Sequence, residues 1–218
     1  MTLEEYKARI KTEESWAPGW EAIDEVFEAL YPGQEPVHYA TDMAHRALFG
    51  GEDYLDGFSF YRSEEGYLHL LTYGMSELYG NEKSFGRDWS KWGYEMTMKL
   101  KGTDPQANLW AVGVLSNLAR YTYTTKFYFE PWQYIKCKGL LEEGTGGRLA
   151  GLLAVPDTTA EGTNTVHGRV DFLQMVGLTG RELEAVMEGQ LTSRELVQRM
   201  EQDSPNLVLD PKRKKEYV

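Results

Sequence analysis

The sequence holds very little of what a secreted or membrane protein needs. It contains a single cysteine, Cys137, so no intramolecular disulfide bond can form, whereas secreted domains usually carry an even set of cysteines. Its longest apolar runs, such as residues 149–155, are far shorter than the roughly 20 residues of a membrane-spanning helix. Residues 1–11 are charged and contain no apolar signal core. We therefore expect a soluble, cytoplasmic protein with no membrane contact.

Positive charge is also scarce. The 218 residues include 23 Lys and Arg against 34 Asp and Glu, which gives a formal net charge of −11. A surface of this sign repels a phosphate backbone, so nucleic acid is not an expected partner. The same charge attracts a basic protein, although the alternative is that it serves only to keep the protein in solution.

Motifs for metals and cofactors are missing as well. The four histidines have no ligand spacing, and no HExxH motif or cysteine pair accompanies them, so we expect no metal site. The glycine-rich residues 144–147 read as a turn, because no Gly-Lys-Ser/Thr follows as in a phosphate loop. We therefore expect no organic cofactor. Cys137 lies between two lysines on a predicted strand, and alternation points its side chain inward, opposite to both.

One segment approaches a catalytic motif. Residues 74–78 read Gly-Met-Ser-Glu-Leu, one residue away from a nucleophile elbow, but Leu78 stands where the tight turn requires glycine. Ser76 is therefore predicted to cap a helix, and no catalytic residue is assigned.

What is present is a mixture of helical and strand patterns. Capping boxes at Thr2, Thr179 and Thr192, together with prolines at first helical positions, predict helices at residues 2–14, 18–30, 105–121, 179 onward and 192 onward. Strands are predicted at residues 58–62, 67–73, 94–100, 134–138, 149–155, 169–176 and 206–209. In residues 94–100, apolar and polar side chains alternate, which predicts a strand with one wet face. Residues 1–218 are thus expected to form a single α+β domain, with a central, mainly antiparallel or mixed sheet and helices packed on it.

The basic tail, residues 212–215, carries four positive charges in a row. Its expected role is that of a solvated terminus.

Several separated segments share an unusual order and spacing. They are Pro-Gly-Trp-Glu-Ala-Ile at 18–23, Gly-Gly-Glu-Asp-Tyr-Leu-Asp-Gly-Phe-Ser at 50–59, Leu-Thr-Tyr-Gly-Met-Ser-Glu-Leu-Tyr at 71–79, Trp-Gly-Tyr-Glu-Met-Thr at 92–97 and Phe-Leu-Gln-Met-Val-Gly-Leu-Thr at 172–179. This set resembles the suppressor-of-fused domain across most of the chain. One departure is Tyr54, where the family pattern has proline.

The resemblance implies a non-catalytic, protein-binding domain. The animal members are much longer and have a second domain that helps to clamp a transcription-factor peptide; nothing in this sequence matches that second domain. The short form resembles the bacterial members, some of which are thought to be immunity proteins that bind and silence a toxin. The partner is then expected to be another protein, with a basic toxin or regulatory protein as the fitting class. An enzyme of unrecognised type and a purely structural or oligomerising protein are the alternatives.

The segment from Gly50 to Tyr79 is the predicted binding surface. It combines turn glycines with acidic and aromatic side chains, a mixture that suits interfaces. The candidate protein-binding residues are Glu52, Asp53, Tyr54, Asp56, Tyr73, Glu77 and Tyr79. The alternative is that Tyr73, Glu77 and Tyr79 pin a buried turn by hydrogen bonds.

Overall fold

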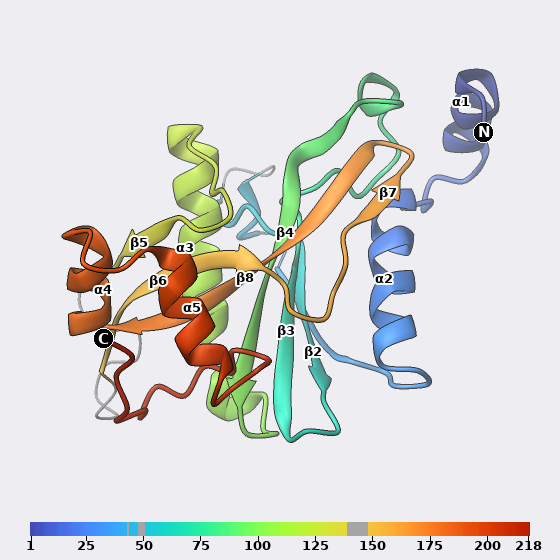
Figure 1. Cartoon of the computed structure of the whole chain (residues 1–218). Coiled ribbons are helices and arrows are strands. Elements are labelled where there is room, and N and C mark those ends of the chain that lie inside the picture. Colours follow the sequence, from blue (N-terminus) through green and yellow to red (C-terminus); the bar gives the residue numbers. More distant parts are fainter. Residues whose placement is uncertain (43, 48–50, 139–147) are drawn as a thin grey trace.

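A computed structural model describes residues 1–42, 44–47, 51–138 and 148–218 (Figure 1). Its helices are α1 (Leu3–Thr12), α2 (Pro18–Leu30), α3 (Leu109–Thr125), α4 (Gly180–Met187) and α5 (Ser193–Glu201). Its strands are β1 (Val37–Ala40), β2 (Gly57–Arg62), β3 (Tyr67–Tyr73), β4 (Trp89–Lys101), β5 (Tyr134–Lys136), β6 (Leu149–Pro156), β7 (Thr163–Thr165) and β8 (Gly168–Thr179). None of the helices in these ranges is long and apolar enough to cross a membrane.

The strands form one mixed, open sheet in the order β1-β2-β3-β4-β8-β6-β5, and β7 pairs with β8 beside this path. The pair β4–β8 is parallel, and the other pairs are antiparallel. This arrangement confirms the predicted α+β class and mixed sheet. The three predicted capping boxes are present as well, at the first residues of α1, α4 and α5.

Helices cover both faces of the sheet. On one face, α3 packs Leu115 and Ala119 into a core with alternate residues of β2, β3, β4, β6 and β8. On the other face, α2 covers β2 and β3, while α4 and α5 cover the end formed by β6 and β8 (Figure 1). The sheet is therefore the middle layer of three, and its central strands are buried on both sides.

The prediction that one face of the strand at residues 94–100 meets water is wrong. Met96 and Met98 face α3 as the alternation predicts, but Glu95, Thr97 and Lys99 on the opposite face are also fully buried. Alternation in sequence reports which side chains share a face, not whether that face meets water. The segment after β6 and the neighbouring strands cover these polar groups and supply their hydrogen-bond partners.

Smaller differences concern element boundaries. The helix expected at residues 105–121 begins at Leu109, after a 3-10 turn, and continues to Thr125. Residues 206–209 contribute a single bridge, Leu100–Leu209, and not a strand, whereas β1 and β7 were not predicted. The predicted glycine turn at 144–147 lies outside the described residues.

Candidate functional site

The predicted binding segment begins with a turn that is locked from inside the protein. Gly74 has φ +129°, a conformation that side chains rarely allow, and it directs the chain around the carboxylate of Glu95. That carboxylate accepts hydrogen bonds from the backbone N–H groups of residues 74, 75 and 76 at 2.9–3.2 Å and from the hydroxyls of Thr72 and Ser76 at 2.7 and 2.6 Å. The prediction that Ser76 caps a helix is therefore wrong, because Ser76 is a buried donor to Glu95.

The two tyrosines that flank this turn have different environments. Tyr73 is buried, stacks on Trp20 with ring centroids 4.1 Å apart, and donates to Asp24 Oδ1 at 2.8 Å. Burial raises the pKa of the Tyr73 hydroxyl far above its usual value. Tyr79 is 45% exposed and donates to Asp56 Oδ1 at 3.2 Å. Tyr73 therefore fits the alternative hypothesis, in which it pins a buried turn, and it is not available to a partner on the candidate surface. Tyr79 remains exposed on that surface.

The acidic members of the predicted segment already have partners within the chain. Asp56 pairs with Arg46 at 2.5 Å. Glu77 Oε2 accepts from Asn81 at 2.8 Å and from Ser84 at 3.1 Å. These contacts hold the segment in place and use part of the charge that was expected to attract a partner.

Residues 52–54 lie against the C-terminal half of α3. Glu52 and Asp53 approach the Arg120 guanidinium at 3.5 and 3.7 Å, and Tyr54 stacks on Tyr123 with ring centroids 4.8 Å apart. The structure therefore brings residues 52–54 to one flank of α3, and Glu52 and Tyr79 are the exposed members of the predicted set.

A groove with a mainly apolar lining lies between α3 and β5. It encloses about 760 Å³ and continues past Cys137, which is half-buried and whose pKa is raised by burial. Three aromatic side chains on its wall and rim are 41–47% exposed. They are Tyr121 of α3, Phe127 of the following loop and Tyr134 of β5. The neighbouring Tyr128 is 51% exposed and lines a second cavity of about 560 Å³ with Trp89.

The groove was not predicted from the sequence, although a signal for it was present. Seven of the fourteen residues from 121 to 134 are aromatic, far above the 13% of the whole chain. Only the structure shows that four of these rings, Tyr121, Phe127, Tyr128 and Tyr134, remain exposed, whereas Phe129 is buried. In the described ranges, β5 pairs with no second strand.

A second buried polar cluster lies on the same sheet face as Glu95. The Asp157 carboxylate follows β6 and contacts His69 Nε2 at 2.9 Å, Lys99 Nζ at 3.0 Å and the Thr97 hydroxyl at 2.5 Å. Burial alone would raise the pKa of Asp157, but His69, Lys99 and Thr97 hold it well below its usual range. Tyr31 completes the cluster through His69 Nδ1 at 2.8 Å. With the Asp157, His69 and Lys99 side chains fully buried and paired, the arrangement is a structural lock and not an open acid–base site.

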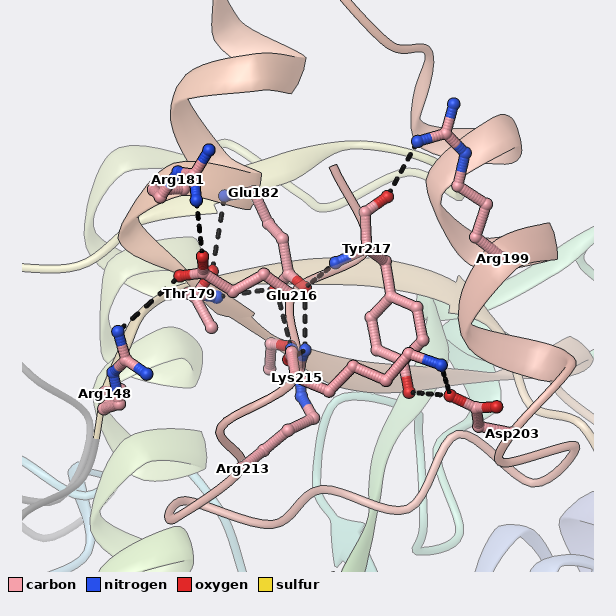
Figure 2. A network of polar contacts seen from close by, with 11 residues as sticks. Arg148, Thr179, Arg181, Glu182, Arg199, Asp203, Arg213, Lys215, Glu216 and Tyr217 are labelled. Carbon is pink, nitrogen blue, oxygen red and sulfur yellow. Dashed lines mark hydrogen bonds and ion pairs between the residues drawn. The ribbon is translucent and has the colours of Figure 1, made fainter.

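The basic tail is not a solvated terminus, contrary to the prediction. Arg213 makes two bonds of 2.7 Å to the fully buried carboxylate of Glu182, and the Tyr217 N–H donates to the same group at 3.1 Å (Figure 2). Figure 2 also shows Lys215 and the Tyr217 hydroxyl converging on Asp203. Glu182 belongs to the capping box of α4, so the tail is fastened to a helix N-terminus.

Within the described ranges, no group of three or more His, Cys, Asp or Glu side chains is arranged to hold a metal ion.

Comparison with known proteins places this architecture. Two solved structures match with a TM-score of 0.81 over 92% of this chain: one from "the Sufu-Fu complex crystal structure", 25% identical with 93% of that chain covered, and Drosophila Suppressor of Fused, 26% identical with 51% covered. A putative homologue from Neisseria gonorrhoeae shares the fold, at 11% identity and a TM-score of 0.60, with 97% of that chain covered.

Sequence comparison agrees. The human Suppressor of fused homolog is 28% identical over 183 residues, in an alignment that covers 78% of this chain and 37% of the human protein. The chain therefore corresponds to little more than a third of that relative. The family model described as Suppressor of fused protein (SUFU) matches residues 51–214, a range that includes the locked turn, the α3–β5 groove and most of the fastened tail. A match over that range shows that the chain belongs to the suppressor of fused family.

Proposed function

We propose that this protein is a non-catalytic binding domain that holds an extended segment of a partner protein in the α3–β5 groove. The supporting observation is the set of three exposed aromatic rings, Tyr121, Phe127 and Tyr134, around a cavity of about 760 Å³. Aromatic anchors in a cleft contribute most of the binding energy of protein interfaces. The solved complex of Sufu with Fu indicates that a related protein binds another protein.

The backbone of β5 supplies a second element of recognition. An edge strand offers N–H and C=O groups to an incoming strand, and main-chain hydrogen bonds of this kind give affinity while the side chains select. Leu118 and Ile135 are apolar lining residues of the groove, and Lys136 at the end of β5 and Lys138 just beyond it line it as well. An extended partner segment with apolar side chains flanked by acidic ones fits this surface.

Substitutions in the groove test the proposal. Phe127→Ala and Tyr134→Ala should each weaken partner binding by about 1–4 kcal/mol, because each removes an aromatic anchor. Trp89→Ala is a matched control, since Trp89 is 53% exposed but lines the other cavity. Binding is measured by calorimetry with a partner first retained from native extract and then purified. If the folded groove variants bound the partner with wild-type affinity, the groove would be excluded as the binding site.

Two finer features belong to the same proposal. The remaining predicted residues, Glu52, Asp53, Tyr54, Asp56, Glu77 and Tyr79, form a second contact area, of which residues 52–54 lie on the neighbouring flank of α3. The net charge of −11 favours a basic partner there. Tyr79→Ala and Glu52→Lys should then weaken binding of the purified partner, the latter through the association rate and less at high salt.

The partner class that fits a short, acidic family member is a toxin, which would make this protein a cytoplasmic immunity protein. Co-expression with the products of adjacent genes tests this role. Growth should be rescued by the wild type and not by Tyr134→Ala. A toxic neighbour that the wild type fails to neutralise, with no binding in vitro, would contradict it.

A further inference from the structure

A pocket of about 480 Å³ lies between α2 and the β1–β2 edge of the sheet, away from the α3–β5 groove. Trp20, Asp24 and Glu28, spaced four residues apart, present one side of α2 to it. Tyr61 and Tyr73 of the sheet and His38 of β1 line it as well. We refer to it as the α2 pocket. Its walls are thus flat aromatic rings with carboxylates beside them.

The α2 pocket is electrostatically negative. Asp24, Glu28 and Glu35 line it, and none of the three forms an ion pair with a Lys or Arg of the described residues. No Lys or Arg is among its described lining residues, and burial lowers the pKa of His38, which favours the neutral ring.

The pKa values of Tyr61 and Asp24 respond to the negative charge of the pocket. Burial, together with the charges of Asp24 and Glu28, raises the pKa of Tyr61 to about 12, although a hydrogen bond involving Tyr73 opposes the rise. Burial also raises the pKa of Asp24, and the charge of Glu28 adds to this effect. Asp24 is therefore partly withdrawn from water without a cation to balance its charge, in contrast to Asp56, which has Arg46, while Glu28 and Glu35 stand exposed beside it.

The ring geometry selects among cations. Trp20 and Tyr73 are stacked within 9° of parallel, and His38 meets both rings edge-on. A guanidinium group is planar, lies favourably against aromatic rings and bonds to carboxylates through two N–H groups at once. An ammonium group is a strongly hydrated point charge and gains less from flat walls.

We infer that the α2 pocket binds an arginine side chain of a partner protein. This inference rests on the proposed function only in assigning the arginine to a protein, and it concerns a surface separate from the groove. Binding would place the guanidinium beside the Asp24 and Glu28 carboxylates and against the half-buried Trp20 ring, which stacks on the buried Tyr73. A partner segment that carries an arginine would thereby gain a second point of attachment, remote from the groove.

The test is a titration with the peptide acetyl-Gly-Gly-Arg-Gly-Gly-amide, followed through the NMR resonance of the Trp20 indole N–H. The expected result is saturable binding of the arginine peptide and at least about tenfold weaker binding of the lysine and citrulline peptides. No saturable shift, or equal shifts from the uncharged citrulline peptide, would overturn the inference.

Variants separate the pocket from general charge attraction. The double variant Asp24→Asn/Glu28→Gln should weaken the arginine peptide at least about tenfold, while keeping an acceptor for the Tyr73 hydroxyl. Glu25→Gln is the matched control, because Glu25 is an exposed acid of α2 outside the pocket lining. An equal loss in Glu25→Gln would indicate attraction by net charge and overturn the inference.

Phe127→Ala and Tyr134→Ala should leave the arginine titration unchanged. Failure of the groove and failure of the α2 pocket are therefore distinguishable.

Discussion

Two carboxylates on one buried face of the sheet are stabilised in opposite ways. Glu95 is surrounded by neutral donors, three backbone N–H groups and two hydroxyls. Asp157, on the same face, faces Lys99 and His69. Burial raises the pKa of Glu95 even though its hydrogen bonds oppose the rise, whereas the pKa of Asp157 is held low by its partners.

The difference shows that burial alone does not set the charge of a group. A neutral cage satisfies the hydrogen-bonding capacity of a carboxylate but does not balance its charge, while a cation does both. The Glu95 cage shapes the turn that positions Ser76 and Tyr79, and the Asp157 cluster ties β3 and β4 to the chain after β6.

The largest effect is expected for Asp157→Ala. This change leaves the Lys99 ammonium buried without its counter-charge, so the free energy of unfolding should fall by about 4 kcal/mol. Asp171→Ala is the matched control: its pair with Arg169 is about two-fifths exposed, and its loss should cost less than about 1 kcal/mol. Urea denaturation measures both, and equal losses would mean that the Asp157 cluster stabilises no more than a surface pair.

Glu95→Gln should destabilise the protein by about 2 kcal/mol. The glutamine keeps the shape but turns an NH₂ group toward donors that need an acceptor. The exposed Glu64→Gln should stay within about 0.5 kcal/mol of the wild type. An Asp157→Asn variant that loses no more stability at neutral pH than Glu95→Gln would remove the distinction between neutral and cationic partners.

The pH dependence should separate the two clusters by sign. The lowered pKa of Asp157 gives stabilisation that is present above about pH 4 and lost as the pH falls below it, by up to about 1.4 kcal/mol per pH unit. The raised pKa of Glu95 gives the reverse: its contribution is greatest below about pH 4 and declines as the pH rises toward the folded-state pKa.

Chemical denaturation between pH 2.5 and 7 measures both slopes. In Asp157→Asn, the loss of unfolding free energy below about pH 4 should become smaller. In Glu95→Gln, the decline of the unfolding free energy as the pH rises above about 4 should disappear. Parallel curves for the wild type and both variants would show that neither group changes its pKa on folding.

The smallest effect is expected at the tail. Arg213→Ala removes the guanidinium from Glu182, but a chain end can lift away and let water reach the carboxylate, so the cost should be about 1 kcal/mol. The Tyr217 amide, which donates to Glu182, should exchange its hydrogen faster. Arg181→Ala is the control, because Arg181 is 72% exposed and contacts Glu216. Unchanged exchange in Arg213→Ala would show that Arg213 does not fasten the tail.

Local patterns in the sequence were sufficient for most helices and strands. Helix starts at residues 2, 18, 179 and 192 were predicted because capping boxes and first-turn prolines act within three or four residues. The strands of the central hairpin and the α+β class were predicted because alternation and turn residues are also local signals. The separated motifs at residues 50–59 and 71–79 led to the family, which the comparisons confirmed.

Only the tertiary structure decided which polar groups are buried and which aromatic ones are not. Glu95 finds its donors some 20 residues away, Lys99 finds Asp157 58 residues later, and Glu182 finds Arg213 31 residues later. Tyr73 and Tyr79 belong to one motif, yet one is a strut and the other lies at the surface. Burial depends on what packs above a side chain, and those layers come from distant segments, so a local pattern determines the element but not its exposure.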